Sequence, residues 1–255
     1  MIILLSPAKR LNFQGPNIAG KHSLPVFMKE SKQLMATLKR LSAKNLQKLM
    51  NINDNLAETN YERFQNWSPE FNENVAKPAL LVFKGDVFLG MDPQSFNKQN
   101  FEFAQEHIRI LSGLHGILKP LDLIRPYRLE MGTDLKIGKS SNLYEFWDDK
   151  ITKSIVDSDV YRKDKIIINL ASKEYFGALK QELLQGRIIE PSFKEFRNGS
   201  YRPVHIFMKR ARGMMTSYIV KNKITDPEKM KLFNCDGYEY NDNLTKDDQW
   251  VFTRG

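Results

Sequence analysis

The chain has 255 residues, of which 41% are hydrophobic and 11% aromatic, so it can bury a sizeable core. Its formal net charge of +9 attracts polyanions such as nucleic acid, phosphorylated metabolites or acidic lipid surfaces, without choosing among them. A single cysteine, Cys235, excludes an intrachain disulfide, and no stretch approaches the ~20 apolar residues of a membrane span. We therefore expect one domain over residues 1–255, a cytoplasmic location and no membrane partner.

Short apolar runs alternate with helical patterns along the chain. Four β-branched or aromatic runs, each followed at once by polar residues, predict buried strands over Ile2 to Leu5, Leu80 to Phe83, Ile166 to Leu170 and Pro203 to Met208. Amphipathic spacing predicts helices over Val26 to Leu41, Ala43 to Asn51, Asn55 to Trp67, Phe101 to Leu111, Tyr144 to Ile155, Glu174 to Leu184 and Gly213 to Val220. The tail, Tyr238 to Phe252, predicts a strand pair. This order favours a mixed α/β (α+β) fold, with a central mixed sheet surrounded by helices.

Polar and cationic residues follow each predicted strand. If the strands are parallel, their carboxyl ends line one crevice, which is where open α/β sheets bind ligands. Each junction alone is explained by an ordinary surface turn, whereas four of them together predict an anion-binding cleft. The candidate cleft residues, with Arg128 added from a later charged stretch, are Ser6, Lys9, Lys84, Arg128, Asn169, Ser172, Lys209, Arg210 and Arg212.

A glycine turn, Gly113-Leu114-His115-Gly116, separates the helical pattern that ends near Leu111 from a second apolar segment, Ile117 to Ile124. The arrangement resembles a helix-hairpin-helix over about residues 100–125, a motif that holds nucleic-acid phosphates through main-chain amides and a helix N-terminus. Two residues between the glycines, instead of one, and Pro120 depart from that motif, and an ordinary αα-hairpin explains the same pattern. The candidate DNA-binding residues are Ser112, Gly113, Leu114, His115, Gly116 and Lys119.

The stretch after the turn interleaves Asp122, Arg125, Arg128 and Glu130 with apolar residues, so some of these charges must be partly buried. An unpaired buried charge costs several kcal/mol, so internal ion pairs or a ligand must compensate them, and both alternatives stay open. If the stretch forms one wall of a functional cleft, the candidate catalytic residues are Lys9, Lys84, Asp86, Arg128 and Glu130. The sequence has no metal-ligand spacing and no GxSxG, P-loop or GxGxxG motif, so we predict no metal and no cofactor.

Several blocks of the sequence together resemble the bacterial YaaA family of peroxide stress proteins. They are SPAK at Ser6–Lys9, FKGDV at Phe83–Val87, LSGL at Leu111–Leu114, PLDL at Pro120–Leu123, PYRLEMG at Pro126–Gly132, INLAS at Ile168–Ser172 and KRARG at Lys209–Gly213. The resemblance runs from Met1 to about Phe252. It implies a cytoplasmic protein that binds double-stranded DNA, aids survival of hydrogen peroxide and limits free iron, with a helix-hairpin-helix beside a positively charged cleft. Where many relatives have tyrosine between the glycines, this chain has His115.

Two functional hypotheses follow. In the first, the protein binds double-stranded DNA without strong sequence preference through the helix-hairpin-helix and the basic cleft. In the second, it is an enzyme acting on a nucleotide or another phosphorylated small molecule, with Lys9, Lys84 and Arg128 neutralising negative charge and Asp86 or Glu130 acting as acid or base. The sequence leaves catalysis and oligomeric state open.

Overall fold

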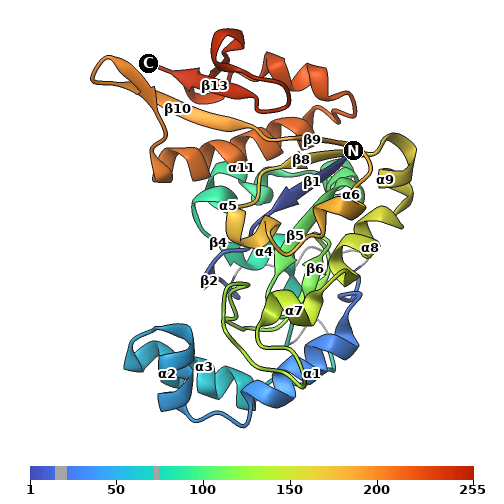
Figure 1. The fold of residues 1–255 in the computed structure, drawn as a ribbon, viewed down its shortest axis with the longest axis vertical. Helices are drawn as coiled ribbons and strands as arrows, with labels where there is room; N and C mark the ends of the chain where they lie inside the picture. Colours follow the sequence, from blue (N-terminus) through green and yellow to red (C-terminus); the bar gives the residue numbers. More distant parts are fainter. Residues whose placement is uncertain (15–21, 72–74) are drawn as a thin grey trace.

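The computed structural model describes residues 1–14, 22–71 and 75–255, and its centre is a five-stranded sheet (Figure 1). The strands, in spatial order, are β6 (Gly116–Leu118), β5 (Ile108–Ser112), β1 (Ile2–Leu5), β8 (Ile166–Asn169) and β9 (Arg187–Ile189). Strands β5, β1, β8 and β9 are parallel, and β6 pairs with β5 in the antiparallel sense. Every residue of β1 and β5 is buried, as expected for apolar strands covered on both faces.

A second sheet of four strands lies at the opposite end of the molecule from α1 to α3 (Figure 1). Its strands, in spatial order, are β11 (Ser200–Arg202), β10 (Ser192–Arg197), β13 (Val251–Arg254) and β12 (Glu239–Tyr240). Strands β12 and β13 are antiparallel, so the strand pair predicted for the tail is confirmed. Two smaller ladders pair β2 (Arg10–Leu11) with β4 (Phe83–Lys84), and β3 (Lys77–Pro78) with β7 (Leu123–Ile124).

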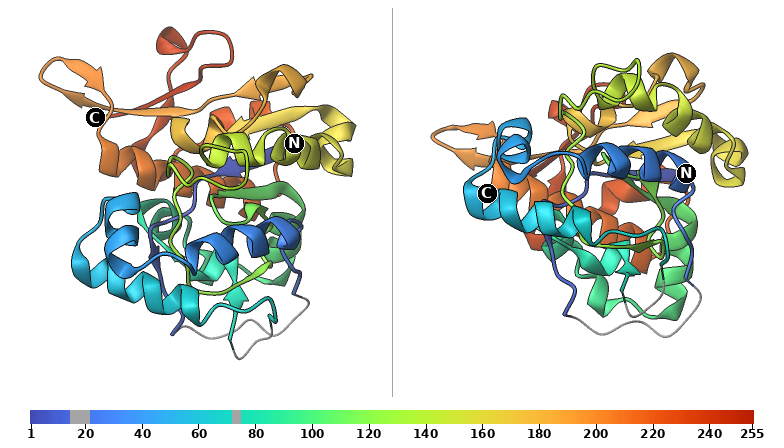
Figure 2. Two further views of the ribbon diagram at one scale, coloured as in Figure 1. Left: turned by 60° about the horizontal axis from the view of Figure 1, so that its bottom comes forward. Right: turned by 90° about the horizontal axis from the view of Figure 1, so that it is seen from below.

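Helices surround the sheets, and the mixed α/β fold is therefore confirmed (Figure 2). Several helices begin where a side chain caps them: Ser42, Asn53 and Asn97 each accept a hydrogen bond from the backbone N–H three residues on. The α-helices are α1 (Met28–Leu38), α2 (Ala43–Met50), α3 (Asp54–Gln65), α4 (Ala79–Val82), α5 (Asp86–Met91), α6 (Lys98–His107), α7 (Leu143–Trp147), α8 (Lys150–Val156), α9 (Asp159–Asp164), α10 (Lys173–Phe176) and α11 (His205–Lys221). The 3₁₀ turns are η1 (Pro93–Ser95), η2 (Gln181–Leu183), η3 (Pro227–Leu232), η4 (Cys235–Gly237) and η5 (Asp242–Leu244).

Two of the four predicted strands are correct and two are wrong. The structure confirms Ile2 to Leu5 and, one residue shorter, Ile166 to Leu170. The run Leu80 to Phe83 is instead mostly α4, and Pro203 to Met208 contains the first turn of α11. Short apolar runs are ambiguous because a buried helical turn and a buried strand need the same residues.

The predicted helix-hairpin-helix is also wrong. Helix α6 ends at His107, and the residues that follow form β5, the glycine turn and β6, which is a β-hairpin at the edge of the central sheet. The β-branched alternation Ile108-Arg-Ile-Leu favours a strand, and its burial decides the outcome. Gly116 has φ +67°, which a glycine adopts without strain at this tight reversal.

Helices α5 and α11 cross in direct backbone contact. A methyl group built on Gly213 would lie 1.8 Å from the Val87 carbonyl oxygen, and one built on Gly90 would lie 2.1 Å from the Arg210 carbonyl oxygen. Glycine at both positions allows this approach, which fixes the start of α11 beside the chain that follows β4. None of the helices in the described ranges is long and apolar enough to cross a membrane.

Candidate anion-binding site at the strand ends

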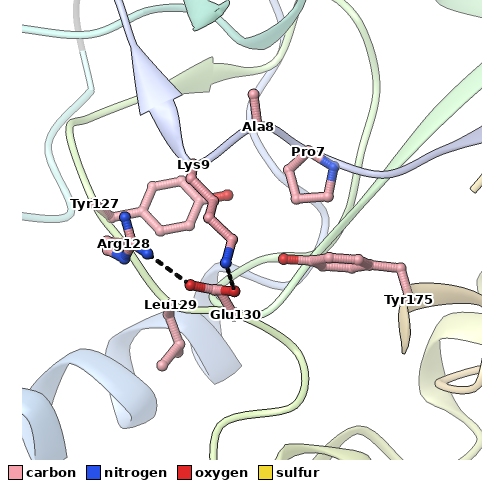
Figure 3. Close-up of a pocket in the computed structure, with 8 residues that line it drawn as sticks. All are labelled: Pro7, Ala8, Lys9, Tyr127, Arg128, Leu129, Glu130 and Tyr175. Carbon is pink, nitrogen blue, oxygen red and sulfur yellow. Dashed lines mark hydrogen bonds and ion pairs between the residues drawn. The ribbon is translucent and has the colours of Figure 1, made fainter. Parts of the chain in front are cut away.

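Lys9, Arg128 and Glu130 meet where the chain leaves β1 (Figure 3). The Lys9 ammonium lies 2.6 Å from Glu130 Oε2, and the Arg128 guanidinium lies 2.9 Å from Glu130 Oε1. The Lys9 side chain is 64% exposed, whereas that of Arg128 is only 15% exposed. One carboxylate thus bridges a cation at the surface and a cation beneath it, which leaves the group with net positive charge.

A small hollow of about 20 Å³ opens at this group, which is room for roughly one water molecule. Its lining residues are Pro7, Ala8, Lys9, Tyr127, Arg128, Leu129, Glu130 and Tyr175. Burial raises the pKa of both Tyr127 and Tyr175 well above the ordinary value, and the charges of Glu174 and, less strongly, Glu130 add to the effect on Tyr175. Both phenols are therefore neutral near pH 7, and Figure 3 shows the Tyr175 hydroxyl directed toward Lys9 and Glu130.

Arg128 has donor capacity that the described residues do not use. Its Nε is buried without a hydrogen-bond partner among them. A second guanidinium, that of Arg63 on α3, is close enough that burial and the charge of Arg128 both lower its pKa. Buried donors near uncompensated positive charge are the feature expected of a site for an anion.

The β5–β6 hairpin supports this site from inside the core. A methyl group on Gly113 would lie 2.4 Å from the Leu129 carbonyl oxygen, so the turn touches the backbone that carries Arg128 and Glu130. The Tyr127 hydroxyl lies 2.7 Å from Ser112 Oγ, and Trp147 Nε1 donates a hydrogen bond of 3.0 Å to the Gly113 carbonyl. The glycine turn is therefore a scaffold for the site.

His115 is fully buried in this scaffold, and burial lowers its pKa to about 3. Its Nδ1 lies 2.9 Å from Ser31 Oγ, while its Nε2 has no hydrogen-bond partner within the described residues. A neutral ring with its proton on Nδ1 leaves only a lone pair unmatched, which costs less than an unmatched N–H. The ring packs edge-on against Tyr127 at 5.2 Å.

Two further polar contacts lie at the strand ends. Ser6 Oγ accepts a hydrogen bond of 2.8 Å from the Ser172 backbone N–H, which joins the residues after β1 and β8. Asn169 Nδ2 donates a hydrogen bond of 2.7 Å to Glu190 Oε1. Burial lowers the pKa of Arg212, and the charge of Glu190 opposes that shift, which places Arg212 within electrostatic reach of Glu190.

The remaining candidates lie on adjoining elements, and the cations among them are exposed. Lys84 is the register partner of Arg10 in the β2–β4 ladder, and a methyl group on Gly85 would lie 3.1 Å from Ala8 Cβ. Asp86 begins α5 and is partly buried. Lys209 and Arg210 are exposed on α11, the helix that crosses α5. We call the exposed set Lys9, Arg10, Lys84, Lys209 and Arg210 the basic face.

The predicted DNA-binding residues do not lie on this face. Ser112, Gly113, Leu114, His115 and Gly116 are buried in the hairpin, so their amides offer no surface to a phosphate. Lys119 is exposed but lines a different groove of about 830 Å³, together with Arg109, Lys150 and Lys153, which shares no residue with the hollow at Lys9. Within the described ranges, no group of three His, Cys, Asp or Glu residues is placed to hold a metal ion.

Three residues of this region escaped the sequence analysis: Arg63, Tyr175 and Glu190. Each is brought in by tertiary contact alone, since Arg63 belongs to an ordinary amphipathic helix and Glu190 follows the short strand β9. Tyr175 had a usable signal, because it lies three residues after Ser172 in a stretch already singled out.

The fold and site define a mixed α/β protein that gathers cations around one carboxylate at the ends of parallel strands. A family model described as peroxide stress protein YaaA matches residues 1–244. The chain is 46% identical over 254 residues to a UPF0246 protein of Teredinibacter turnerae, and 45% and 44% identical over the same length to UPF0246 proteins of Colwellia psychrerythraea and Saccharophagus degradans. Each match covers 100% of this chain and 99% of the relative. The chain belongs to the YaaA family of peroxide stress proteins.

Proposed function

We propose that this peroxide stress protein binds double-stranded DNA through the basic face, without strong sequence preference. The observation that supports the proposal best is the Arg10–Lys84 pairing, because it brings exposed cations from two distant parts of the chain together next to α5, and α5 in turn contacts α11, the helix that carries Lys209 and Arg210. Lysine and arginine at such a surface neutralise phosphates and release counterions, which gives affinity that does not depend on sequence. Protein held on DNA in this way is placed to limit iron-driven damage there.

The test is the salt dependence of binding to fluorescently labelled duplexes of unrelated sequence. The logarithm of affinity is expected to fall linearly with the logarithm of salt concentration, by about 0.9 for each neutralised phosphate. The double variant Lys84→Ala/Lys209→Ala should bind more weakly and with a shallower slope. Lys44→Ala/Lys163→Ala removes the same charge from exposed positions on α2 and α9 and serves as the control. Equal losses in both double variants would refute the basic face.

A second candidate function is binding, or turnover, of a small phosphorylated molecule at the Lys9–Glu130–Arg128 group. The specific observation in its favour is the largely buried Arg128, whose guanidinium pairs with Glu130 while its Nε has no hydrogen-bond partner among the described residues. A hollow of about 20 Å³ is too small for a nucleotide, so Lys9 or Glu130 must move for one to enter. Thermal stabilisation by phosphate, nucleotides and sugar phosphates tests this site. Stabilisation that is equal in the parent, Lys84→Ala and Glu130→Gln would exclude it.

A further inference from the structure

The β10–β11 ribbon, residues 192–202, is a second cationic feature of the molecule. Figures 1 and 2 show it projecting beyond the rest of the chain in each view. Between Ser192 and Arg212 the sequence contains one acidic residue, Glu195, against six basic ones. The basic residues are Lys194, Arg197, Arg202, Lys209, Arg210 and Arg212.

The base of the ribbon is anchored to the second sheet. Strand β10 pairs with β13 as far as Glu195, whose register partner is Arg254 at the end of β13. Phe193 is buried and stacks on Phe252 with ring centroids 5.5 Å apart. The Glu195 carboxylate lies 2.9 Å from Arg254 Nε and also accepts a hydrogen bond from the Tyr238 hydroxyl. The single acid of the ribbon is therefore used inside the fold, and its charge is compensated there.

From Glu195 onward, strand β10 pairs with β11, and Glu195 is the register partner of Arg202. Phe196 faces Tyr201 and Arg197 faces Ser200 across the ladder, with ring centroids of the aromatic pair 5.2 Å apart. Asn198 at φ 50° and Gly199 at φ 77° form the two-residue turn that suits a tight, twisted hairpin. The tip is thus a regular two-stranded element rather than an irregular loop.

The ribbon carries two guanidinium groups, that of Arg197 near its tip and that of Arg202 at its base. Both side chains are exposed, and neither forms an ion pair with an acidic residue of the described ranges, since Glu195, the register partner of Arg202, pairs with Arg254 instead. Arg202 Nε donates to Ser200 Oγ at 3.0 Å, and Arg197 lies 5.7 Å from the centre of the Phe207 ring, so both are held near the ribbon without being neutralised. Phe196 (50% exposed) and Ile206 (57% exposed) add apolar surface beside them.

We propose that the β10–β11 ribbon enters a groove of duplex DNA, with Arg197 and Arg202 binding its phosphates or base edges. This inference rests on the proposed DNA-binding function and names a second contact for it. The major groove of B-DNA, about 12 Å wide, admits a two-stranded ribbon. The uncompensated arginines favour a polyanion over a protein partner for the exposed apolar residues. Two exposed cations of the basic face, Lys209 and Arg210, follow the ribbon in the sequence on α11.

The test is anisotropy of a labelled duplex of about 20 base pairs, about two helical turns, with the full chain and the double variant Arg197→Gln/Arg202→Gln. We expect roughly five-fold or greater loss of affinity near physiological salt, and a slope smaller by about 1.8 if each arginine neutralises one phosphate. Arg197→Lys/Arg202→Lys should restore the slope because it keeps the charge. Thermal denaturation should give the parent value for all of these variants, since both side chains are exposed. Lys44→Ala/Lys163→Ala is again the charge-matched control.

The outcomes separate the two proposals. If the parent binds duplex and Arg197→Gln/Arg202→Gln binds with the same affinity and slope, the ribbon inference is wrong and the basic face stands. If the parent binds no duplex at any salt concentration, the proposed function fails and the ribbon inference fails with it. Self-association that Phe196→Ser abolishes, with no change in DNA binding on Arg197→Gln/Arg202→Gln, would assign the ribbon to a second copy of the chain and overturn the inference.

Discussion

Gly113 lies against the Leu129 carbonyl oxygen so closely that a side chain on the glycine has no space: a methyl group there would be 2.4 Å from that oxygen. The contact joins the turn between two strands of the central sheet to the segment that carries Arg128 and Glu130. The geometry of the ion group at the surface is therefore set by packing in the core beneath it.

Gly113→Ala should lower the free energy of unfolding by about 1–3 kcal/mol, the usual cost of overpacking. The new methyl group would meet the Leu129 carbonyl oxygen, which belongs to the backbone and cannot rotate away as a side chain could. Urea denaturation measures the change. Gly132→Ala is the control from the same segment, since its nearest atom is a flexible Glu174 carboxylate oxygen 3.5 Å away. Its stability should stay within about 1 kcal/mol of the parent. A Gly113→Ala protein as stable as the parent would contradict the described contact.

Gly213→Ala should also destabilise the protein, although the same change in an open helix stabilises it by about 1 kcal/mol. The reason is the Val87 carbonyl oxygen, 1.8 Å from the position of the new methyl group. Thermal denaturation of Gly213→Ala, Gly90→Ala and the double variant forms a thermodynamic cycle. Because both glycines serve one helix crossing, the two losses should be less than additive. A rise in stability for Gly213→Ala would show that α5 and α11 are further apart than described.

Acid should weaken the fold through His115. Its pKa is about 3 in the folded protein and near 6.5 in the unfolded chain, so between these values the unfolded state binds more protons. The free energy of unfolding should therefore fall by about 1.4 kcal/mol for each unit of pH below 6.5, and the loss is absent above that pH. His115→Gln, which cannot titrate, should show a shallower fall in urea denaturation between pH 4 and 6.5.

His205→Gln makes the same substitution at an exposed position on α11 and serves as the control. Some slope should persist in His115→Gln, because burial also lowers the pKa of His107. If His115→Gln and His205→Gln follow the same curve as the parent, His115 is not the buried neutral group that the structure describes.

Glu130→Gln should increase affinity for duplex DNA or inorganic phosphate by roughly two- to ten-fold, because it removes the carboxylate that compensates Lys9 and Arg128. Glu58→Gln changes the same charge at an exposed position on α3 and should have little effect. Affinity can be measured by anisotropy and by isothermal titration. Weaker anion binding by Glu130→Gln would mean that the carboxylate holds the site in its binding shape and is not a competing charge.

Local sequence pattern predicted the strands that dominate the core. Ile2 to Leu5 and Ile166 to Asn169 are continuous β-branched or leucine runs that end at polar residues, and both lie in the centre of the sheet. The pattern failed at Ile108 to Ser112, where the apolar residues of the strand extended the spacing of helix α6. It failed again at the start of α11, which has no capping side chain to mark the boundary.

The candidate site was predictable in part. Lys9, Arg128 and Glu130 stood out because cations and a carboxylate interrupt apolar sequence, and the structure brings these three together. The approach of Arg63 to Arg128 and of Glu190 to Arg212 joins residues far apart in the chain, and neither pair belongs to a periodic pattern. Arg63 lies on α3 and Arg212 lies on α11. The position of each helix is set by tertiary packing and not by local sequence spacing.

The burial of the hairpin divides this protein into two kinds of position for mutagenesis. A survey that scores abundance in cells will find Ser112 to Gly116 intolerant, since these side chains and amides are enclosed by Trp147, Tyr127 and Leu129. A survey that scores ligand binding by the soluble protein will find its sensitive positions elsewhere. They will be arginines and lysines whose replacement does not change the amount of folded protein.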